Sequence, residues 1–130
     1  MIRYALAVLA LVQLPANAGE YDGSYLCLGK AGAVINERNG IAKGYDLQME
    51  PEKYVVRIEG EGGSWGKFGY ETKESFTDNY SPFHFYTTNY NYFAFNPQLL
   101  TFTRSVFGTY FENKHLGLTP YIVVGDCSKI

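Results

Sequence analysis

The chain contains two cysteines, Cys27 and Cys127, one near each end of the sequence that follows its first apolar run. In an oxidising compartment two such cysteines pair, and closing a loop of ~100 residues stabilises a fold by ~4–5 kcal/mol in the chain-entropy model. Redox-active pairs usually have Cys-x-x-Cys spacing, which is absent here. The chain also has two histidines, but together with the two cysteines they do not have the spacing of a zinc site. We therefore expect a structural disulfide and no metal or cofactor.

The first 18 residues have the three parts of a secretory signal peptide. One positive charge at Arg3 precedes the apolar run 4–14, and Ala16 and Ala18 supply the small residues before a cleavage point at Gly19. The apolar run is too short to cross a bilayer, which takes ~20 residues. We expect residues 1–18 to be removed and 19–130 to form a single β-domain. We expect it in the periplasm of a Gram-negative bacterium rather than outside the cell.

The remaining sequence is typical of short strands separated by turns. Glycine, tyrosine, phenylalanine, threonine and valine abound, and strong helix formers are sparse. The segment Tyr21 to Leu28 reads as the first strand and Tyr121 to Val124 as the last, which leads to Cys127. Asn39-Gly40 is a strong hairpin signal. The alternative for 31–38 is one loose helical turn.

This pattern predicts an all-β fold of seven to nine antiparallel strands in meander order. A disulfide between the first and last strands would bring the two sheet edges near each other. A small barrel does this, and a compact sandwich is the alternative. Closure of the sheet would also remove exposed strand edges.

The densest aromatic stretch runs from Tyr80 to Phe95 and would place aromatic side chains on both faces of its strands. One face holds Phe83 and Phe85 and builds the core, and the other would be a surface rich in Tyr, His and Asn. Such side chains suit glycan stacking or protein contacts. The alternative is ordinary cross-strand packing. The candidate binding surface consists of Trp65, His84, Tyr86, Tyr90 and Tyr92.

Catalytic signals are weak. Residues 62–66 fit the pattern Gly-x-Ser-x-Gly, but they belong to a glycine-rich segment that opens no helix, whereas a nucleophile elbow needs a strand-to-helix turn. The two histidines are His84 and His115. Glu59 and Glu61 could serve as a glycosidase pair, but they lie in a glycine-rich loop in which nothing fixes their separation. After removal of Arg3 the chain carries ten basic and 13 acidic side chains, which argues against a nucleic-acid partner.

Two resemblances follow from short motifs. Tyr25-Leu26-Cys27, Phe93-Ala94-Phe95-Asn96 and Gly125-Asp126-Cys127 resemble those of a group of short exported proteobacterial proteins, which implies no activity. The plan of an early and a late cysteine in a small β-barrel is similar to periplasmic inhibitors of c-type lysozyme. Trp65-Gly66-Lys67 matches part of their Trp-x-Lys-Gly element, but Phe68 replaces its glycine.

We therefore expect a non-enzymatic binding domain that acts in the cell envelope through an aromatic strand face. Its partner would be an envelope protein or glycan, with no membrane span after signal cleavage. The alternatives are a periplasmic inhibitor of a lysozyme-type enzyme, or a hydrolase of an envelope polymer. The hydrolase would gather His84 or His115 in a cleft with carboxylates such as Glu61 or Asp78.

Overall fold

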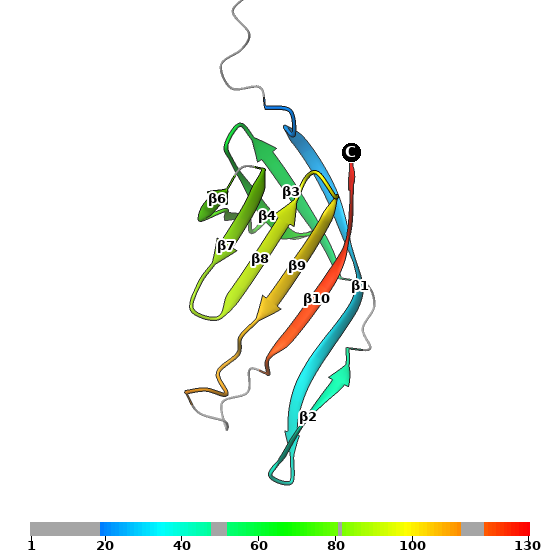
Figure 1. The fold of residues 1–130 in the computed structure, drawn as a ribbon, viewed down its shortest axis with the longest axis vertical. Coiled ribbons are helices and arrows are strands. Elements are labelled where there is room, and N and C mark those ends of the chain that lie inside the picture. The colour runs from blue at the N-terminus through cyan, green and yellow to red at the C-terminus, as the bar shows by residue number, and fades with distance from the viewer. Residues whose placement is uncertain (1–18, 48–51, 81, 113–118) are drawn as a thin grey trace, which may run out of the picture.

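The chain folds into one antiparallel sheet that curls into a half-barrel (Figure 1). The computed structural model describes residues 19–47, 52–80, 82–112 and 119–130, so the predicted signal peptide lies outside the described residues. Ten strands appear in this part of the chain: β1 (Gly23–Arg38), β2 (Ile41–Asp46), β3 (Lys53–Glu59), β4 (Gly62–Lys67), β5 (Glu74–Ser75), β6 (Asp78–Tyr80), β7 (Phe83–Thr87), β8 (Asn91–Asn96), β9 (Thr101–Val106) and β10 (Tyr121–Lys129).

The expected all-β antiparallel fold is confirmed, while the strand count exceeds the expected seven to nine. The strand order in the sheet is β5-β4-β3-β1-β10-β9-β8-β7-β6, and β2 pairs with β1 outside this path. The additional strands are explained by β5 and β6, which are only two and three residues long. Strands this short leave little trace in an alternating sequence pattern. No helix in the described part of the chain is long and apolar enough to cross a membrane.

The long strand β1 organises the sheet because it pairs with three neighbours. Its first residues pair with β3, its middle with β10 and its last with β2. A bulge between Gly29 and Ala31 shifts the register against β10. The turn to β2 has positive φ angles at Asn39 and Gly40, 53° and 76°, as a two-residue hairpin of type I′ requires. The predicted hairpin is therefore confirmed, and the helical alternative for 31–38 is wrong.

The predicted disulfide between Cys27 and Cys127 is present, but it lies in the middle of the sheet. The two cysteines are directly opposite each other on β1 and β10, with Cα atoms 4.0 Å apart. The Cys127 N–H donates to the carbonyl of Leu100 at 2.7 Å and so faces away from β1. The cysteines thus form a closely spaced pair without mutual backbone hydrogen bonds. The expectation that this disulfide joins two sheet edges is wrong, since the path ends at β5 and β6.

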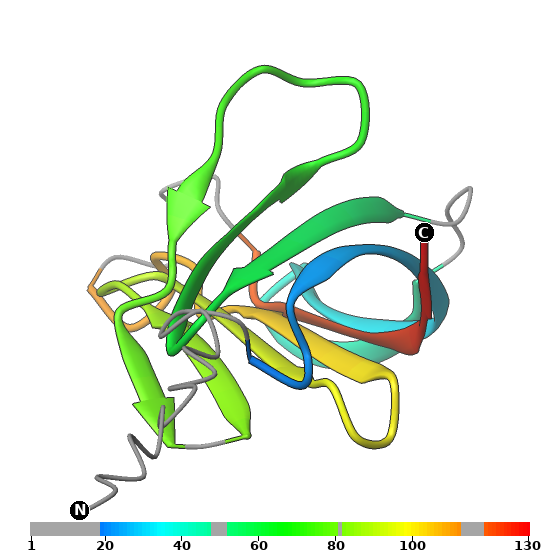
Figure 2. The same ribbon diagram turned by 90° about the horizontal axis from the view of Figure 1, so that it is seen from above.

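Curling brings the two halves of the sheet face to face (Figure 2). Trp65 on β4 stacks on Phe93 of β8, with ring centroids 4.3 Å apart. Along the sheet these two strands are separated by β3, β1, β10 and β9. Between β5 and β6 the chain passes from one end of the sheet to the other. There the Phe76 N–H donates to Gly63 on β4 at 2.9 Å, and the Thr77 N–H donates to Phe85 on β7 at 2.8 Å. These two bonds join both halves at one corner.

Side chains alternate along each strand between the inner face, which forms the core, and the outer face. The core is mainly aromatic, and its rings meet edge-on or stacked at separations typical of folded proteins. Its buried members are Tyr25, Cys27, Tyr54, Val56, Ile58, Trp65, Phe76, Phe93, Phe95, Phe102, Val123 and Cys127.

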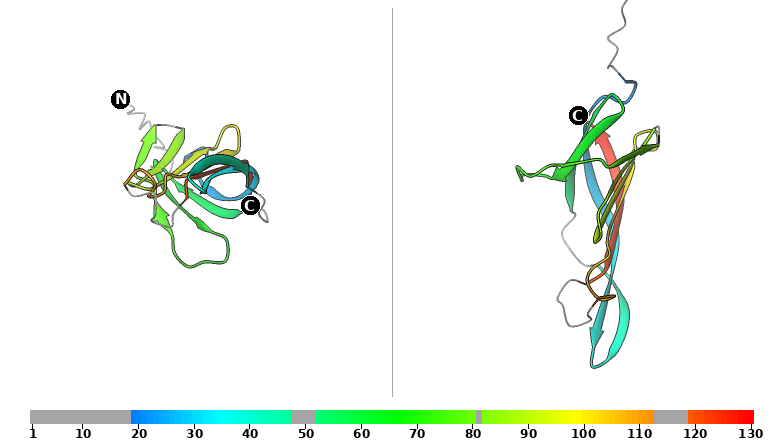
Figure 3. Two further views of the ribbon diagram at one scale, coloured as in Figure 1. Left: turned by 90° about the horizontal axis from the view of Figure 1, so that it is seen from below. Right: turned by 90° about the vertical axis from the view of Figure 1, so that its left-hand side faces the viewer.

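The end of β1 and the whole of β2 extend beyond the body of the sheet as a two-stranded arm (Figures 1 and 3). All six residues of β2 are exposed. Apolar side chains on this arm, Ile35, Ile41 and Tyr45, are 49%, 59% and 41% exposed. The arm therefore contributes little to the core.

Candidate functional site

The outer face of β6 and β7 carries a cluster of aromatic side chains. Successive side chains of a strand point to opposite faces. On β7, His84 and Tyr86 point inward, and Phe83 and Phe85 therefore point outward. The ring of Phe85 lies 5.9 Å from that of Tyr80 on β6 and 6.5 Å from that of Phe83. Tyr80 is 69% exposed and Phe83 38% exposed, so much of this aromatic area faces solvent.

A shallow hollow of about 120 Å³ opens beside this cluster. It is lined by Phe83, Phe85, Ala94, Phe95, Asn96, Thr101, Phe102 and Thr103. The lining contains no charged side chain, and it combines aromatic rings with two hydroxyl groups and one amide. The Asn96 side-chain oxygen accepts hydrogen bonds from the backbone N–H groups of Gln98 and Leu99, which fixes the amide at the turn.

Tyr92 extends this face on the next strand. It lies on β8 directly opposite Thr87 of β7 and Ser105 of β9, and it is 47% exposed. We call Tyr80, Phe83, Phe85 and Tyr92 the outer aromatic surface. Of the five residues expected to form a binding surface, Tyr92 is the one that belongs to it.

Trp65 and His84 are part of the core, which corrects their expected place on a surface. They are 4% and 5% exposed. Trp65 is held between Phe93 and the rings of Tyr54 and Tyr86. His84 Nδ1 is 2.6 Å from the side-chain oxygen of Asn79, and burial lowers the pKa of His84. On β7 the face expected to be a surface is the inner face, and Phe83 and Phe85 point outward instead.

Tyr86 and Tyr90 are half-buried and lie apart from this surface. Tyr86 packs edge-on against Trp65 inside the half-barrel. Burial, the charge of Glu74 and a hydrogen bond to it raise the pKa of Tyr86. The Tyr90 hydroxyl donates to Glu112 at 2.8 Å, and this bond raises the pKa of Tyr90. The five residues are thus divided among three environments.

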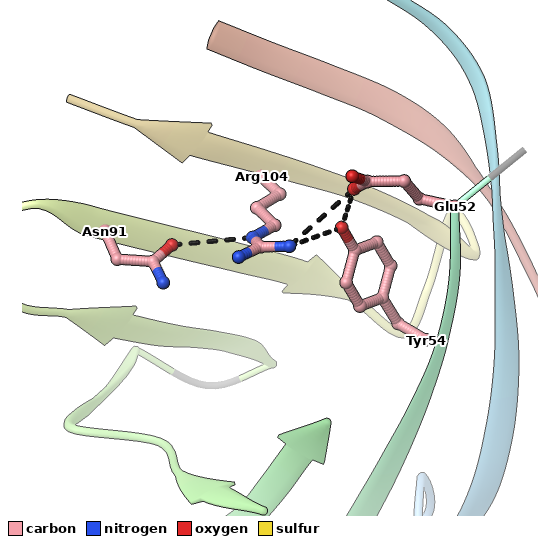
Figure 4. A network of polar contacts seen from close by, with 4 residues as sticks. All are labelled: Glu52, Tyr54, Asn91 and Arg104. Atoms are coloured by element: carbon pink, nitrogen blue, oxygen red, sulfur yellow. Dashed lines mark hydrogen bonds and ion pairs between the residues drawn. The ribbon is translucent and has the colours of Figure 1, made fainter. Parts of the chain in front are cut away.

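A polar network occupies the inner face of the half-barrel around Arg104 of β9 (Figure 4). Arg104 Nη1 donates to the hydroxyl of Tyr54 at 2.7 Å and lies 3.7 Å from a carboxylate oxygen of Glu52. The Tyr54 hydroxyl donates to that same carboxylate. Arg104 Nε donates to the Asn91 side-chain oxygen at 3.5 Å.

This network is deeply enclosed. The Arg104 side chain is 10% exposed and that of Glu52 11%. The guanidinium carbon also lies 5.3 Å, 5.4 Å and 5.8 Å from the ring centres of Tyr54, Trp65 and Tyr121. A buried cation is stable only when it is paired and hydrogen-bonded, and both conditions are met here. The arrangement is that of a structural ion pair within an aromatic core.

The sequence contains one signal for this network. The pattern of strand 99–106 places Arg104 on the same face as Leu100 and Phe102. A charged residue in an otherwise apolar row indicates a buried partner. Its partner Glu52 lies directly before β3, 52 positions earlier, where no periodicity relates the two residues.

The described residues considered for catalysis lie in different environments. His84 contacts an amide rather than a nucleophile or a carboxylate, and it lies in the core. Glu59 pairs with Arg57 at 2.6 Å on the exposed face of β3. Within the four described segments there is no group of three or more His, Cys, Asp or Glu side chains that could hold a metal ion. His115, the other histidine considered for the hydrolase, lies outside the described residues.

The Trp65-Gly66-Lys67 element lies in strand β4, where Trp65 is buried and Lys67 exposed. Comparison of the chain with protein-family models, curated proteins and solved structures found no match. The outer aromatic surface and its hollow are therefore the features of the molecule that point to a function.

Proposed function

We propose that the protein is a non-enzymatic binding domain of the cell envelope, and that its outer aromatic surface holds an uncharged glycan. The observation that carries this proposal is the exposed ring cluster beside a hollow of about 120 Å³ with no charged lining residue. Binding sites for small ligands combine apolar walls with a few placed polar groups, as this hollow does.

A sugar ring has chemistry on two sides that matches this lining. Its C–H groups form an apolar face that can pack on the rings of Phe83 and Phe85. Its hydroxyl groups lie at the edge of the ring and can exchange hydrogen bonds with Thr101 and Thr103. Both threonine side chains line the hollow, which places their hydroxyl groups beside a ligand bound there.

The location in the envelope is part of the proposal. The Cys27–Cys127 disulfide suits an oxidising compartment, and residues 1–18 have the form of an export signal. An exported bacterial protein meets cell-wall and surface glycans there. An envelope protein seated on the same aromatic surface is the competing partner.

The test measures binding of the mature chain, residues 19–130, to purified cell-wall and surface polysaccharides by titration calorimetry. The double variant Tyr80→Ser/Phe83→Ser should weaken binding at least tenfold, since it removes two exposed rings. Tyr70→Ser is the matched control: Tyr70 has the same 69% exposure as Tyr80 but follows β4. Equal affinity of the double variant and the control would refute the proposal. Retention of an envelope protein in place of any glycan would refute it as well.

A further inference from the structure

The arm formed by β1 and β2 carries a free strand edge. Among the described strands, β2 pairs with β1 alone, so its second edge has no strand beside it. All six of its residues are exposed. The ends of the main path, β5 and β6, are only two and three residues long. A short edge offers little to another strand, and β2 is therefore the edge best suited to strand addition.

The hairpin geometry determines which backbone groups of β2 point outward. The residues that flank a two-residue turn, Arg38 and Ile41, form a hydrogen-bonded pair, and such pairs alternate along an antiparallel ladder. Residues 41, 43 and 45 consequently bond to β1. The alternation continues beyond β2, where the N–H of Leu47 donates to the carbonyl of Gly32 on β1 at 2.8 Å. The outward backbone groups are those of Ala42, Gly44 and Asp46.

Among the described residues, none blocks a second strand along the free edge of β2. Its sequence contains no proline, and its register against β1 runs without a bulge from Arg38–Ile41 to Ala33–Asp46. Proteins commonly protect a free edge with prolines, bulges or several charges. The only charged side chains here are one of each sign, Lys43 and Asp46.

Gly44, at the middle of β2, has no explanation within its own chain. Its φ is not in the left-handed region, and a Cβ atom built on it meets nothing within 4 Å. Neither turn geometry nor close packing therefore requires a glycine. A side chain at position 44 therefore meets no obstacle within the chain, which the substitutions proposed below use.

These observations point to a second copy of the same chain as the occupant. We infer that two copies associate through the free edges of β2, antiparallel and about a two-fold axis at Gly44. In an antiparallel pair, outward residues must oppose outward residues. The partner strand can then be centred on Lys43, Gly44 or Tyr45.

The side chains distinguish these three registers. Centring on Lys43 opposes two lysines, and centring on Tyr45 leaves half of β2 without a partner. Centring on Gly44 places Lys43 of each copy opposite Tyr45 of the other copy. The symmetric pair thus has two such contacts, and each favours a cation–π interaction. This register also forms about six backbone hydrogen bonds between the copies, because each of its three outward pairs exchanges two.

Cross-linking tests this register directly. In it the two copies of residue 44 are opposed with Cα atoms ~5.5 Å apart, within the range of a disulfide. Gly44→Cys should therefore give a covalent dimer on a non-reducing gel of the mature protein after mild oxidation. Ala42→Cys is the control on the same edge: its two copies are offset by four residues, more than ~13 Å apart, and should stay uncross-linked. Equal cross-linking of both variants, or of neither, would overturn the inference.

Sedimentation velocity provides the second test and needs no new cysteine. The unaltered mature protein should show the mass of a dimer, with the dimer fraction rising with concentration. Gly44→Pro removes an N–H that β1 does not use, at an edge position that tolerates proline. It should therefore give a monomer with an unchanged far-ultraviolet circular dichroism spectrum, whereas Gly44→Thr should stay dimeric. A monomeric unaltered protein, or a dimer that persists in Gly44→Pro, would overturn the inference.

Discussion

Replacing Arg104 by methionine should destabilise the protein by about 3 kcal/mol, the lower end of the cost of breaking a buried ion pair. Methionine fills a similar volume but leaves the Glu52 carboxylate without its cation, and this side chain is 11% exposed. Three aromatic rings also lose the guanidinium that lies against them. The residual exposure of Glu52 lets water reach the charge, so we expect the lower end of the range. For a domain of this size, such a loss lowers Tm by more than about 10 °C.

Urea unfolding followed by fluorescence measures this loss, because Trp65 is the only tryptophan and is buried in the core. Arg57→Met is the matched control. Arg57 lies 2.6 Å from the carboxylate of Glu59, closer than Arg104 to Glu52, but both side chains are more than half exposed. This exposed pair should contribute less than ~1 kcal/mol. The comparison therefore separates burial from distance.

The double variant Arg104→Met/Glu52→Gln tests the electrostatic cause. It removes both charges, so no unpaired carboxylate stays in the core, and it should be more stable than Arg104→Met alone. If Arg104→Met costs no more than Arg57→Met, the network is not a buried ion pair in the energetic sense. A double variant less stable than the single one would show that packing, not charge, dominates at Arg104.

Two further predictions concern the core. Replacing Cys27 and Cys127 by alanine should cost ~4–5 kcal/mol in the chain-entropy model, and a urea midpoint unchanged from the disulfide-bonded protein would contradict it. Burial lowers the pKa of His84 from its ordinary value of 6.5, so the unfolded chain binds more protons as pH falls below that value. The free energy of unfolding should therefore decrease as the pH is lowered through about 6.5. The dependence of the free energy of unfolding on pH should be weaker in His84→Gln. In the control His115→Gln the contribution of His84 should persist. An identical pH dependence in both variants would contradict this prediction.

Local features of the fold were predictable because short-range geometry determines them. Asn39-Gly40 suits a type I′ turn since both residues tolerate positive φ, and the hairpin forms there. The alternation of Tyr54, Val56 and Ile58 places these side chains in the core as expected for a half-buried strand.

The order of strands was not predictable from the cysteines. A disulfide shows that Cys27 and Cys127 are close, but it does not show whether their strands lie at the edges or in the middle of a sheet. The structure places them in the middle because β1 pairs with β3 on its other side. The short strand β5 and the crossing at Phe76 and Thr77 depend on contacts with distant strands, which no local pattern encodes.

The sequence located the aromatic strands of the candidate site, but it did not determine which side chains of β7 point to the solvent. Both faces of β7 are aromatic, so hydrophobicity alone does not determine which one points inward. The structure turns His84 inward, where Asn79 meets its ring nitrogen, and turns Phe83 and Phe85 outward. A polarity argument favoured the opposite arrangement, because it could not anticipate the polar partners available inside.

The place of β10 beside β1 also determines when this protein can fold. A chain emerges from the ribosome with β1 first and β10 last, yet these two strands form the centre of the sheet. Until β10 emerges, β1 lacks the neighbour that joins it to β9 and β8. Closing this long loop costs conformational entropy before its contacts are made, so folding should be slow, as in other proteins rich in non-local strand pairs. The centre of the sheet therefore forms only after β10 has been synthesised, although β2 and β3 can pair with β1 before then.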